Sequence, residues 1–187
     1  MEIELKIPLR ADLYDMTAVE SQISAKLGPQ IEDVIQEDTY FQSPARDFSV
    51  SDEALRIRHI RSVNGFNIVE MTYKGAKKGD EMKIREEITL QVSDADTTHV
   101  MLTRLGFLEV MTVKKHRTNW SSPEEMQISL DQVEGLGTFL EIELLATDLI
   151  EAKQRIKQMA KTLLPDWDGT EERRSYLELL LDATSSK

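Results

Sequence analysis

The stretch MEIELKIPL, residues 1–9, opens the chain with alternating charged and apolar side chains. Its central residues are Glu2, Ile3, Glu4, Leu5 and Lys6. Because successive side chains of a β-strand point to opposite faces, this pattern predicts a strand with one charged and one apolar face. Its charged face is either in water or part of a site.

The same alternation recurs in the segments LRIR, MTYK, KIREE, KKHR, MQISLD and LEIEL. Their charged faces and that of the first strand carry eight bases and six acids: Lys6, Arg56, Arg58, Lys74, Lys83, Arg85, Lys115, Arg117, Glu2, Glu4, Glu87, Asp131, Glu141 and Glu143. The whole chain has 23 bases, 34 acids and a net charge of −11. This shared face is therefore the basic region of an acidic protein.

A half-buried antiparallel strand with its charges in water would show the same alternation. Two observations favour a site instead. Asp, Glu and Lys are depleted in strands, and here the charges are sorted by sign within each strand. We therefore expect the charged faces to point inward and line a tunnel, with helices on the apolar outside. Like charges 4 Å apart cost about 4 kcal/mol at an effective dielectric of 20, so carboxylates, water or a bound anion must neutralise the bases.

The remaining pattern predicts one domain over residues 1–187, with a frayed tail at about 183–187. Hydrophobic residues make up 40% of the chain and charged residues 30%, as in a globular protein. Asn64-Gly65 between alternating runs predicts a two-residue hairpin turn. Helices are expected at about 16–27, 94–105 with Ser93 as N-cap, 148–163 and 171–182. The predicted fold class is α+β: a single-domain eight-stranded antiparallel β-barrel, or tunnel, with a charged interior and helices packed outside.

Composition excludes several classes of function. The chain has no cysteine, which excludes disulfides and thiolate metal sites. No apolar run approaches the roughly 20 residues of a membrane span, and the N-terminus lacks the pattern of a signal peptide. The sequence pI of about 4.8 disfavours nucleic acid as a partner. We expect a cytoplasmic protein that binds neither nucleic acid nor membrane.

The grouped carboxylates suit a hard cation such as Mg²⁺ or Mn²⁺, since no histidine or cysteine accompanies them. Mg²⁺ commonly joins one or two carboxylates to substrate phosphates. Arginines can form paired hydrogen bonds with phosphate oxygens, and lysines act as point charges. Bases for phosphate together with acids for metal indicate a metal–polyphosphate ligand.

These motifs resemble the CYTH superfamily, also called triphosphate tunnel metalloenzymes. EIELK matches the family's ExExK signature, and DTYFQSP, residues 38–44, resembles its D-x-Y-F-D-T-P segment. LRIR, TYKG, REE, KKHR, LDQVEGLGTFLEIE and RSYLELL follow in family order over nearly the whole chain. Gln42 and Ala76 depart from the family pattern and affect only local loop shape.

The resemblance implies a tunnel that binds a triphosphate with divalent metal. It implies metal ligands at Glu2, Glu4, Asp131, Glu141 and Glu143, with Glu87 as a further candidate. It implies catalytic roles for Glu4, Lys6, Glu141 and Glu143. The implied triphosphate contacts are Lys6, Arg56, Arg58, Lys74, Arg85, Lys115 and Arg117.

The chain looks most like the class IV adenylyl cyclase and thiamine triphosphatase group. The leading hypothesis is a cyclase that converts ATP to cyclic AMP and pyrophosphate. One alternative is a triphosphatase that hydrolyses inorganic tripolyphosphate, thiamine triphosphate or a nucleoside triphosphate; another is a non-catalytic polyphosphate binder. The tunnel motifs do not separate these functions, nor do they identify the general base, the base-recognition pocket or the metal. The resemblance suggests a homodimer.

Overall fold

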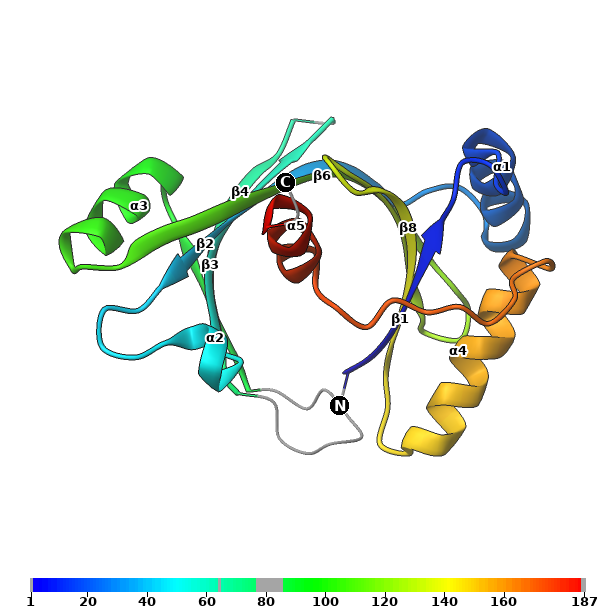
Figure 1. Cartoon of the computed structure of the whole chain (residues 1–187). Helices are drawn as coiled ribbons and strands as arrows, with labels where there is room; N and C mark the ends of the chain where they lie inside the picture. Colours follow the sequence, from blue (N-terminus) through cyan, green and yellow to red (C-terminus); the bar gives the residue numbers. More distant parts are fainter. Residues whose placement is uncertain (1, 64, 77–85, 186–187) are drawn as a thin grey trace. The chain divides into compact units, whose positions relative to one another are not determined.

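A computed structural model of the chain describes residues 2–63, 65–76 and 86–185, with Glu2 described by its backbone only. Figure 1 labels the elements of these residues: β1 (Glu2–Leu9), α1 (Met16–Leu27), β2 (Glu32–Gln42), α2 (Phe48–Ser51), β3 (Ala54–Ser62), β4 (Asn67–Lys74), β5 (Glu87–Val92), α3 (Ala95–Arg104), β6 (Leu108–Ser121), β7 (Gln127–Val133), β8 (Gly137–Leu145), α4 (Leu149–Leu163) and α5 (Tyr176–Ser185). Asn64 of the predicted turn, Lys83 and Arg85 lie outside the described residues.

The eight strands form one antiparallel sheet in the order β1-β8-β7-β6-β2-β3-β4-β5. The predicted α+β class with eight antiparallel strands is confirmed. β1 and β5 are the edge strands, and no ladder between described residues joins them. The described helices include none with the length and apolar character of a membrane span.

The chain divides into two compact units, and the first consists of Met1–Asp33 and Lys115–Lys187. In this unit α4 packs against β1, β8 and α1, and Figure 1 shows both helices on the same side of β1 and β8. The core between them includes Ile7, Trp120 and Ile142, each at most 1% exposed. The predicted apolar strand faces and the inward face of α4, with Ala152, Ile156, Ala160 and Leu163, are buried as expected.

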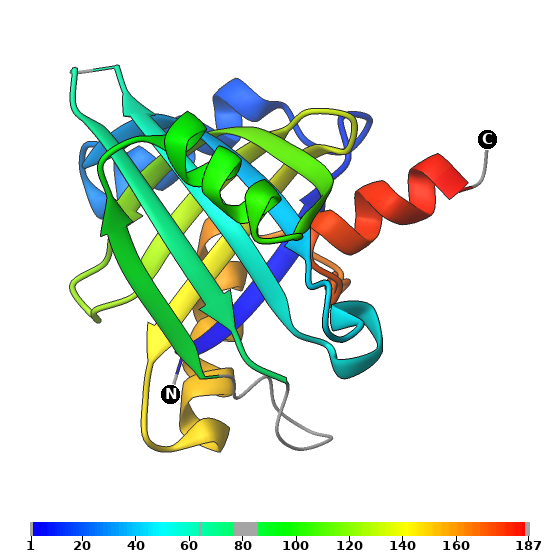
Figure 2. The same cartoon turned by 90° about the vertical axis from the view of Figure 1, so that its left-hand side faces the viewer.

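The second unit consists of Val34–Lys114. Its core joins one face of the sheet to α2 and α3 through Phe41, Phe48, Leu55, Ile57 and Leu102. Figure 2 shows α3, in green, lying across the strands of this unit. In both units, therefore, helices cover much of the apolar face of the strands and leave the charged face to other contacts. The prediction is wrong for Ile88 of β5, which is 50% exposed.

The helix ends differ from the predictions in three places. Asp94, not Ser93, is the N-cap of α3, because its carboxylate accepts a hydrogen bond from the Thr97 amide (2.7 Å). The short helix α2 is additional, and its N-cap Asp47 accepts from the Ser49 amide (2.8 Å). α5 begins at Tyr176 instead of about 171, and its helical turns continue to Ser185, inside the predicted tail.

A capping box explains where α5 begins. Ser175 Oγ accepts from the Glu178 amide (3.2 Å), and the Glu178 carboxylate accepts from the Ser175 amide (2.7 Å). This reciprocal pair satisfies donors that a helix start leaves unpaired. The preceding residues are held differently, since the Glu172 amide donates to the Lys6 carbonyl of β1 (2.8 Å). Residues 171–175, expected to be helical, therefore belong to the connection 164–175 between α4 and α5.

Candidate functional site

In the first unit, strand register brings the predicted residues onto one face. Lys6 lies opposite Glu141, and Glu4 lies opposite Glu143, between β1 and β8. Arg117 of β6 lies opposite Asp131 of β7. The alternate residues of these strands, such as Ile142, are in the core. The polar face of unit 1 is therefore assembled from four neighbouring strands.

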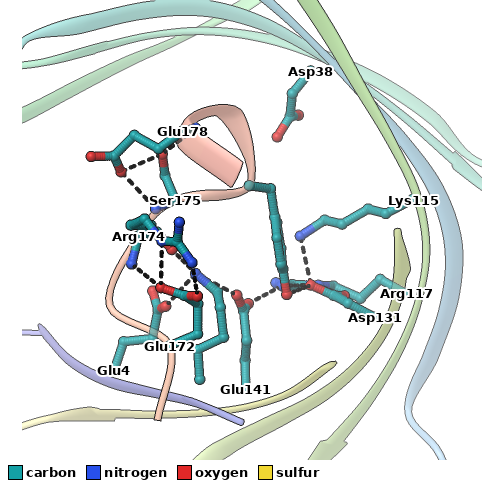
Figure 3. Close-up of polar contacts among 12 residues, drawn as sticks. Glu4, Asp38, Lys115, Arg117, Asp131, Glu141, Glu172, Arg174, Ser175 and Glu178 are labelled. Atoms are coloured by element: carbon teal, nitrogen blue, oxygen red, sulfur yellow. Dashed lines mark hydrogen bonds and ion pairs between the residues drawn. The ribbon is translucent and has the colours of Figure 1, made fainter. Parts of the chain in front are cut away.

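Asp131 is the centre of this face and is 0% exposed. Arg117 donates to it through Nε (2.6 Å to Oδ1) and Nη2 (2.5 Å to Oδ2). Lys115 Nζ donates to Oδ2 (2.9 Å), and so does the Tyr176 hydroxyl (3.0 Å). Figure 3 shows Lys115 and Arg117 directed toward Asp131. Both carboxylate oxygens are thus occupied by donors.

Glu141 joins this cluster to β1. It is 4% exposed, and its carboxylate accepts from Arg117 Nη2 and lies 3.4 Å from Lys6 Nζ. Lys6 Nζ also lies 3.1 Å from Glu4. Burial alone would raise the pKa of Glu141, but Arg117, Lys115 and Lys6 outweigh it and hold that pKa below its usual value. Burial opposes the charge on Lys6, and Glu4 and Glu141 more than compensate and raise its pKa.

Tyr176, the first residue of α5, covers part of the polar face of unit 1. The centre of its ring lies 4.5 Å from Lys6 Nζ, 5.1 Å from Lys115 Nζ and 5.1 Å from the Phe139 ring centre. Burial, Glu141 and Asp131 raise the pKa of the phenol, so its hydroxyl stays protonated and acts as a donor. Lys6 Nζ also donates to the Arg174 carbonyl (3.2 Å), which ties the C-terminal segment to β1.

The second unit repeats the pairing of one aspartate with two bases. Asp38 of β2 lies opposite Arg58 of β3 and is 4% exposed. Arg58 donates to its two oxygens through Nε and Nη2 (2.6 Å each), and Arg56 Nη1 lies 3.4 Å from Oδ2. The predicted bases Arg56 and Arg58 are therefore brought together by an aspartate. Lys74 is separate from them and pairs with Glu87 (2.6 Å) at the β4–β5 ladder.

The predicted site residues thus fall into three groups. Lys6, Glu4, Lys115, Arg117, Asp131, Glu141 and Glu143 share one face of unit 1; Arg56, Arg58 and Lys74 belong to unit 2. Arg85 and the Glu2 side chain lie outside the described residues. Alternation alone does not single out Asp38 or Tyr176. The signals for them were the first residue of the DTYF segment and the S-x-x-E capping motif beside Tyr176.

The carboxylates of unit 1 are of the type that binds a divalent cation. Carboxylate oxygens are the ligands that Mg²⁺ and Mn²⁺ take, and Glu4 and Glu143 offer them on paired residues of β1 and β8. Within residues 2–63, 65–76 and 86–185, no three potential ligands are gathered closely enough to hold a metal. Asp131 fits poorly because four hydrogen bonds occupy its oxygens. The ligand type fits at Glu4 and Glu143.

Chemically, each aspartate-centred group is suited to an anion. Arg56 and Arg58 share Asp38, so this group keeps more positive than negative charge. Lys115 and Arg117 share Asp131, and Arg117 also pairs with Glu141, so fixed donors rather than excess charge mark this group. Buried cations with fixed donors attract phosphate oxygens more strongly than exposed ones.

Comparisons with known proteins agree with this chemistry. The CYTH domain profile matches residues 1–176. A protein of Methanocaldococcus jannaschii that carries the provisional name adenylate cyclase is 38% identical over 180 residues, which are 95% of this chain and 98% of that protein. Adenylate cyclase CyaB of Aeromonas hydrophila is 27% identical, covering 93% of this chain and 87% of that protein.

Solved structures agree on the fold. The structure of a protein from Pyrococcus horikoshii is 40% identical to this chain and has a TM-score of 0.81. The match covers 98% of this chain and 99% of that one. A structure from Vibrio parahaemolyticus, provisionally named adenylate cyclase, has a TM-score of 0.76 at 22% identity, covering 96% of this chain and 97% of that one. At that identity the second likeness concerns the fold alone. Together they support the α+β fold with eight antiparallel strands that the sequence predicts.

Proposed function

Because the chain belongs to the CYTH family, we propose that it is a divalent-metal-dependent enzyme acting on a triphosphate, and specifically an adenylyl cyclase. In this reaction the ribose 3′-oxygen of ATP attacks the α-phosphorus. The bond from that phosphorus to the bridging oxygen breaks, and cyclic AMP and pyrophosphate form. The two relatives named as adenylate cyclases, one of them provisionally, support this assignment over hydrolysis. We also propose a cytoplasmic enzyme whose partner is its small-molecule substrate, with neither nucleic acid nor membrane bound.

The observation that carries the proposal is the burial of three cations on the polar face of an acidic protein. Lys6, Lys115 and Arg117 are 5%, 5% and 6% exposed. Removing charged groups from water is costly unless partners compensate, and a face that served only solubility would leave its charges exposed. A polyanionic ligand accounts for both the burial and the sign of these residues.

The residues of this chain have distinct proposed roles. Lys6, Lys115 and Arg117 of unit 1 bind phosphate oxygens, as do Arg56, Arg58 and Lys74 of unit 2, with Arg85 assigned by resemblance. Their fixed charges stabilise negative charge that builds up on those oxygens in the transition state. Glu141 holds Lys6 and Arg117 in place, and Asp131 holds Lys115 and Arg117.

The metal would be held by Glu4 and Glu143, with Glu2 assigned by resemblance. A bound Mg²⁺ or Mn²⁺ supplies charge neutralisation and orientation of the phosphates. We assign Asp131 to positioning bases instead, because Lys115, Arg117 and Tyr176 already occupy its oxygens.

Product analysis tests the proposal. The protein is incubated with ATP, tripolyphosphate or thiamine triphosphate in the presence of Mg²⁺ or Mn²⁺, and products are separated by anion exchange. We expect cyclic AMP and pyrophosphate in equal amounts. Orthophosphate without cyclic AMP would overturn the cyclase assignment in favour of a triphosphatase. Tight binding of all three compounds without turnover would show that the protein binds polyphosphate but is not an enzyme for these substrates.

Glu4→Gln tests the metal assignment. Loss of this carboxylate charge should abolish metal-dependent turnover, while the melting temperature stays close to that of the wild type because Glu4 is partly exposed. Glu20→Gln on the exposed surface of α1 is the matched control and should keep full activity. Undiminished turnover in Glu4→Gln, with the same metal requirement, would remove Glu4 from the metal site.

A further inference from the structure

Tyr176 contacts two of the bases that are proposed to bind the triphosphate. The centre of its ring lies 4.5 Å from Lys6 Nζ and 5.1 Å from Lys115 Nζ. Both distances are within the range of a cation–π contact, in which the negative face of a ring attracts a positive group. Among the described residues, no other aromatic ring contacts two cations.

The two lysines reach this ring from the outer strands of the polar face of unit 1. The face consists of β1, β8, β7 and β6 in that order, with Lys6 on β1 and Lys115 on β6. At about 4.8 Å between neighbouring strands, the backbones of β1 and β6 are about 14 Å apart. Both ammonium groups nevertheless lie close to one ring. The ring of Tyr176 is therefore the point where side chains from the two sides of the face meet.

Tyr176 is held at the middle of this face by groups other than the lysines. Its hydroxyl donates to Asp131 of β7 (3.0 Å), and its ring packs against Phe139 of β8, with 5.1 Å between the ring centres. Asp131 and Phe139 lie opposite each other in the β7–β8 ladder. Tyr176 is 8% exposed and begins α5 directly after the Ser175–Glu178 capping box. Packing and one hydrogen bond thus fix the ring without any ligand.

A ring restrains a lysine differently from a carboxylate. Glu141 pairs with Lys6, and Asp131 pairs with Lys115, but each acid also cancels positive charge. Tyr176 is neutral, so its contacts restrict the positions of the ammonium groups and leave their charge unchanged. Lysine has a flexible four-carbon stem, and a binding group that is already ordered loses less entropy when its ligand arrives. The ring therefore prepares both lysines for an anion.

We propose that Tyr176 is a positioning residue of the triphosphate site, and that its ring holds Lys6 and Lys115 where both attract the same phosphate chain. This inference rests on the proposed triphosphate site and adds to it a residue that does not touch the substrate. It concerns the phosphate chain alone, so it applies to any triphosphate that the protein binds. It also gives α5 a role in the site, since the first residue of that helix carries the ring.

The test compares Tyr176→Phe, which keeps the ring, with Tyr176→Leu, which removes it. Binding of tripolyphosphate with Mg²⁺ is measured by calorimetry, below the melting temperature of every variant. We expect the dissociation constant to rise about tenfold in Tyr176→Leu, the size expected from two cation–π contacts, and less than about threefold in Tyr176→Phe. Tyr14→Leu is the matched control. Tyr14 is partly buried against the core of unit 1, so this variant should lose stability and keep the dissociation constant.

A purely structural role for Tyr176 would lower the melting temperature and leave binding unchanged, so an unchanged dissociation constant in Tyr176→Leu would overturn the inference. Equal weakening in Tyr176→Phe would also overturn it, because the hydroxyl and not the ring would then matter. Equal weakening in Tyr14→Leu would do the same, since the effect would then follow from lost stability. If Tyr176→Leu does not fold, Phe139→Leu decides. This variant keeps the tyrosine and removes the ring beside it, so the constant should rise about threefold, and no rise would overturn the inference.

The wild type separates this inference from the proposal beneath it. If the wild type does not bind tripolyphosphate, the proposed function fails, and the positioning role with it. If the wild type and Tyr176→Leu bind tripolyphosphate equally well, the triphosphate site stands and only the positioning role of Tyr176 fails.

Discussion

Replacing Asp131 by asparagine should destabilise the protein strongly, even without any ligand. The change removes the negative charge that Lys115 and Arg117 share, at a residue that is 0% exposed. It also places an amide NH₂ against donors, since all four hydrogen bonds to the carboxylate come from donor groups. Arg117 then retains Glu141 and the more distant influence of Glu143 as acids on this face.

The magnitude follows from that loss of compensation. Removing one partner of a buried ion pair typically costs 3–5 kcal/mol, about 3–5 times the effect of a neutral hydrogen bond. We therefore expect the free energy of unfolding to fall by about 4 kcal/mol. For a chain of this length such a loss lowers the melting temperature by about 10 °C.

Urea unfolding followed by circular dichroism, at pH 7 with EDTA present, measures this loss. Asp166→Asn, at an exposed loop position, should differ from the wild type by less than about 0.5 kcal/mol. If Asp131 were only a metal ligand among other carboxylates, removing its charge without metal would leave stability unchanged or increase it. A loss below about 1 kcal/mol for Asp131→Asn would therefore refute the positioning role.

Two further predictions concern the same face. Tyr176→Phe removes only the hydroxyl that donates to Asp131, so the free energy of unfolding in urea should fall by about 1 kcal/mol. The ring contacts with Lys6 and Lys115 remain in this variant but are lost in Tyr176→Ala. An equal loss of stability in the two variants would contradict the prediction. The pKa of Glu141 lies below its usual value, and the pKa of Glu172, hydrogen-bonded to Arg174, is about 2. A carboxylate whose pKa is lowered by folding stabilises the protein above its unfolded pKa of about 4.3, and that stability is lost as pH falls toward the folded value. The urea midpoint should therefore drop between pH 5 and pH 2.5, and a constant midpoint over that range would refute the coupling.

The strand faces could be predicted from sequence because they depend on a local rule. Alternation fixes which side chains of a strand share a face, so Lys6, Glu141 and Arg117 fall on the polar side and Ile7, Ile142 and Trp120 in the core. The start of α5 also depends on a local rule, although the predicted start at about 171 did not use it. Ser175 and Glu178 form a capping box that the S-x-x-E spacing signals, and it outweighs the helical pattern of the preceding residues.

The function of each charge within the face could not be predicted in the same way. Asp131 and Glu141 look alike in sequence, yet Asp131 is saturated by donors because register places it opposite Arg117. Tyr176 reaches Asp131 across 45 positions of the chain, and that contact depends on where residues 171–175 run along β1.

One arrangement occurs in both units and resolves the repulsion between neighbouring bases. Two bases two residues apart on a strand, Lys115 and Arg117 or Arg56 and Arg58, face a single buried aspartate on the adjacent strand. In each case the second base of the pair lies directly opposite the aspartate and binds it through two nitrogens. One carboxylate is enough to hold two cations in fixed positions but not to neutralise them. The Asp38 group therefore keeps about one positive charge, which an incoming phosphate can compensate, whereas in unit 1 Glu141 is a second carboxylate bound to Arg117. A chain with a net charge of −11 can therefore keep bases in fixed, buried positions on one face, because carboxylates of neighbouring strands compensate their charge there.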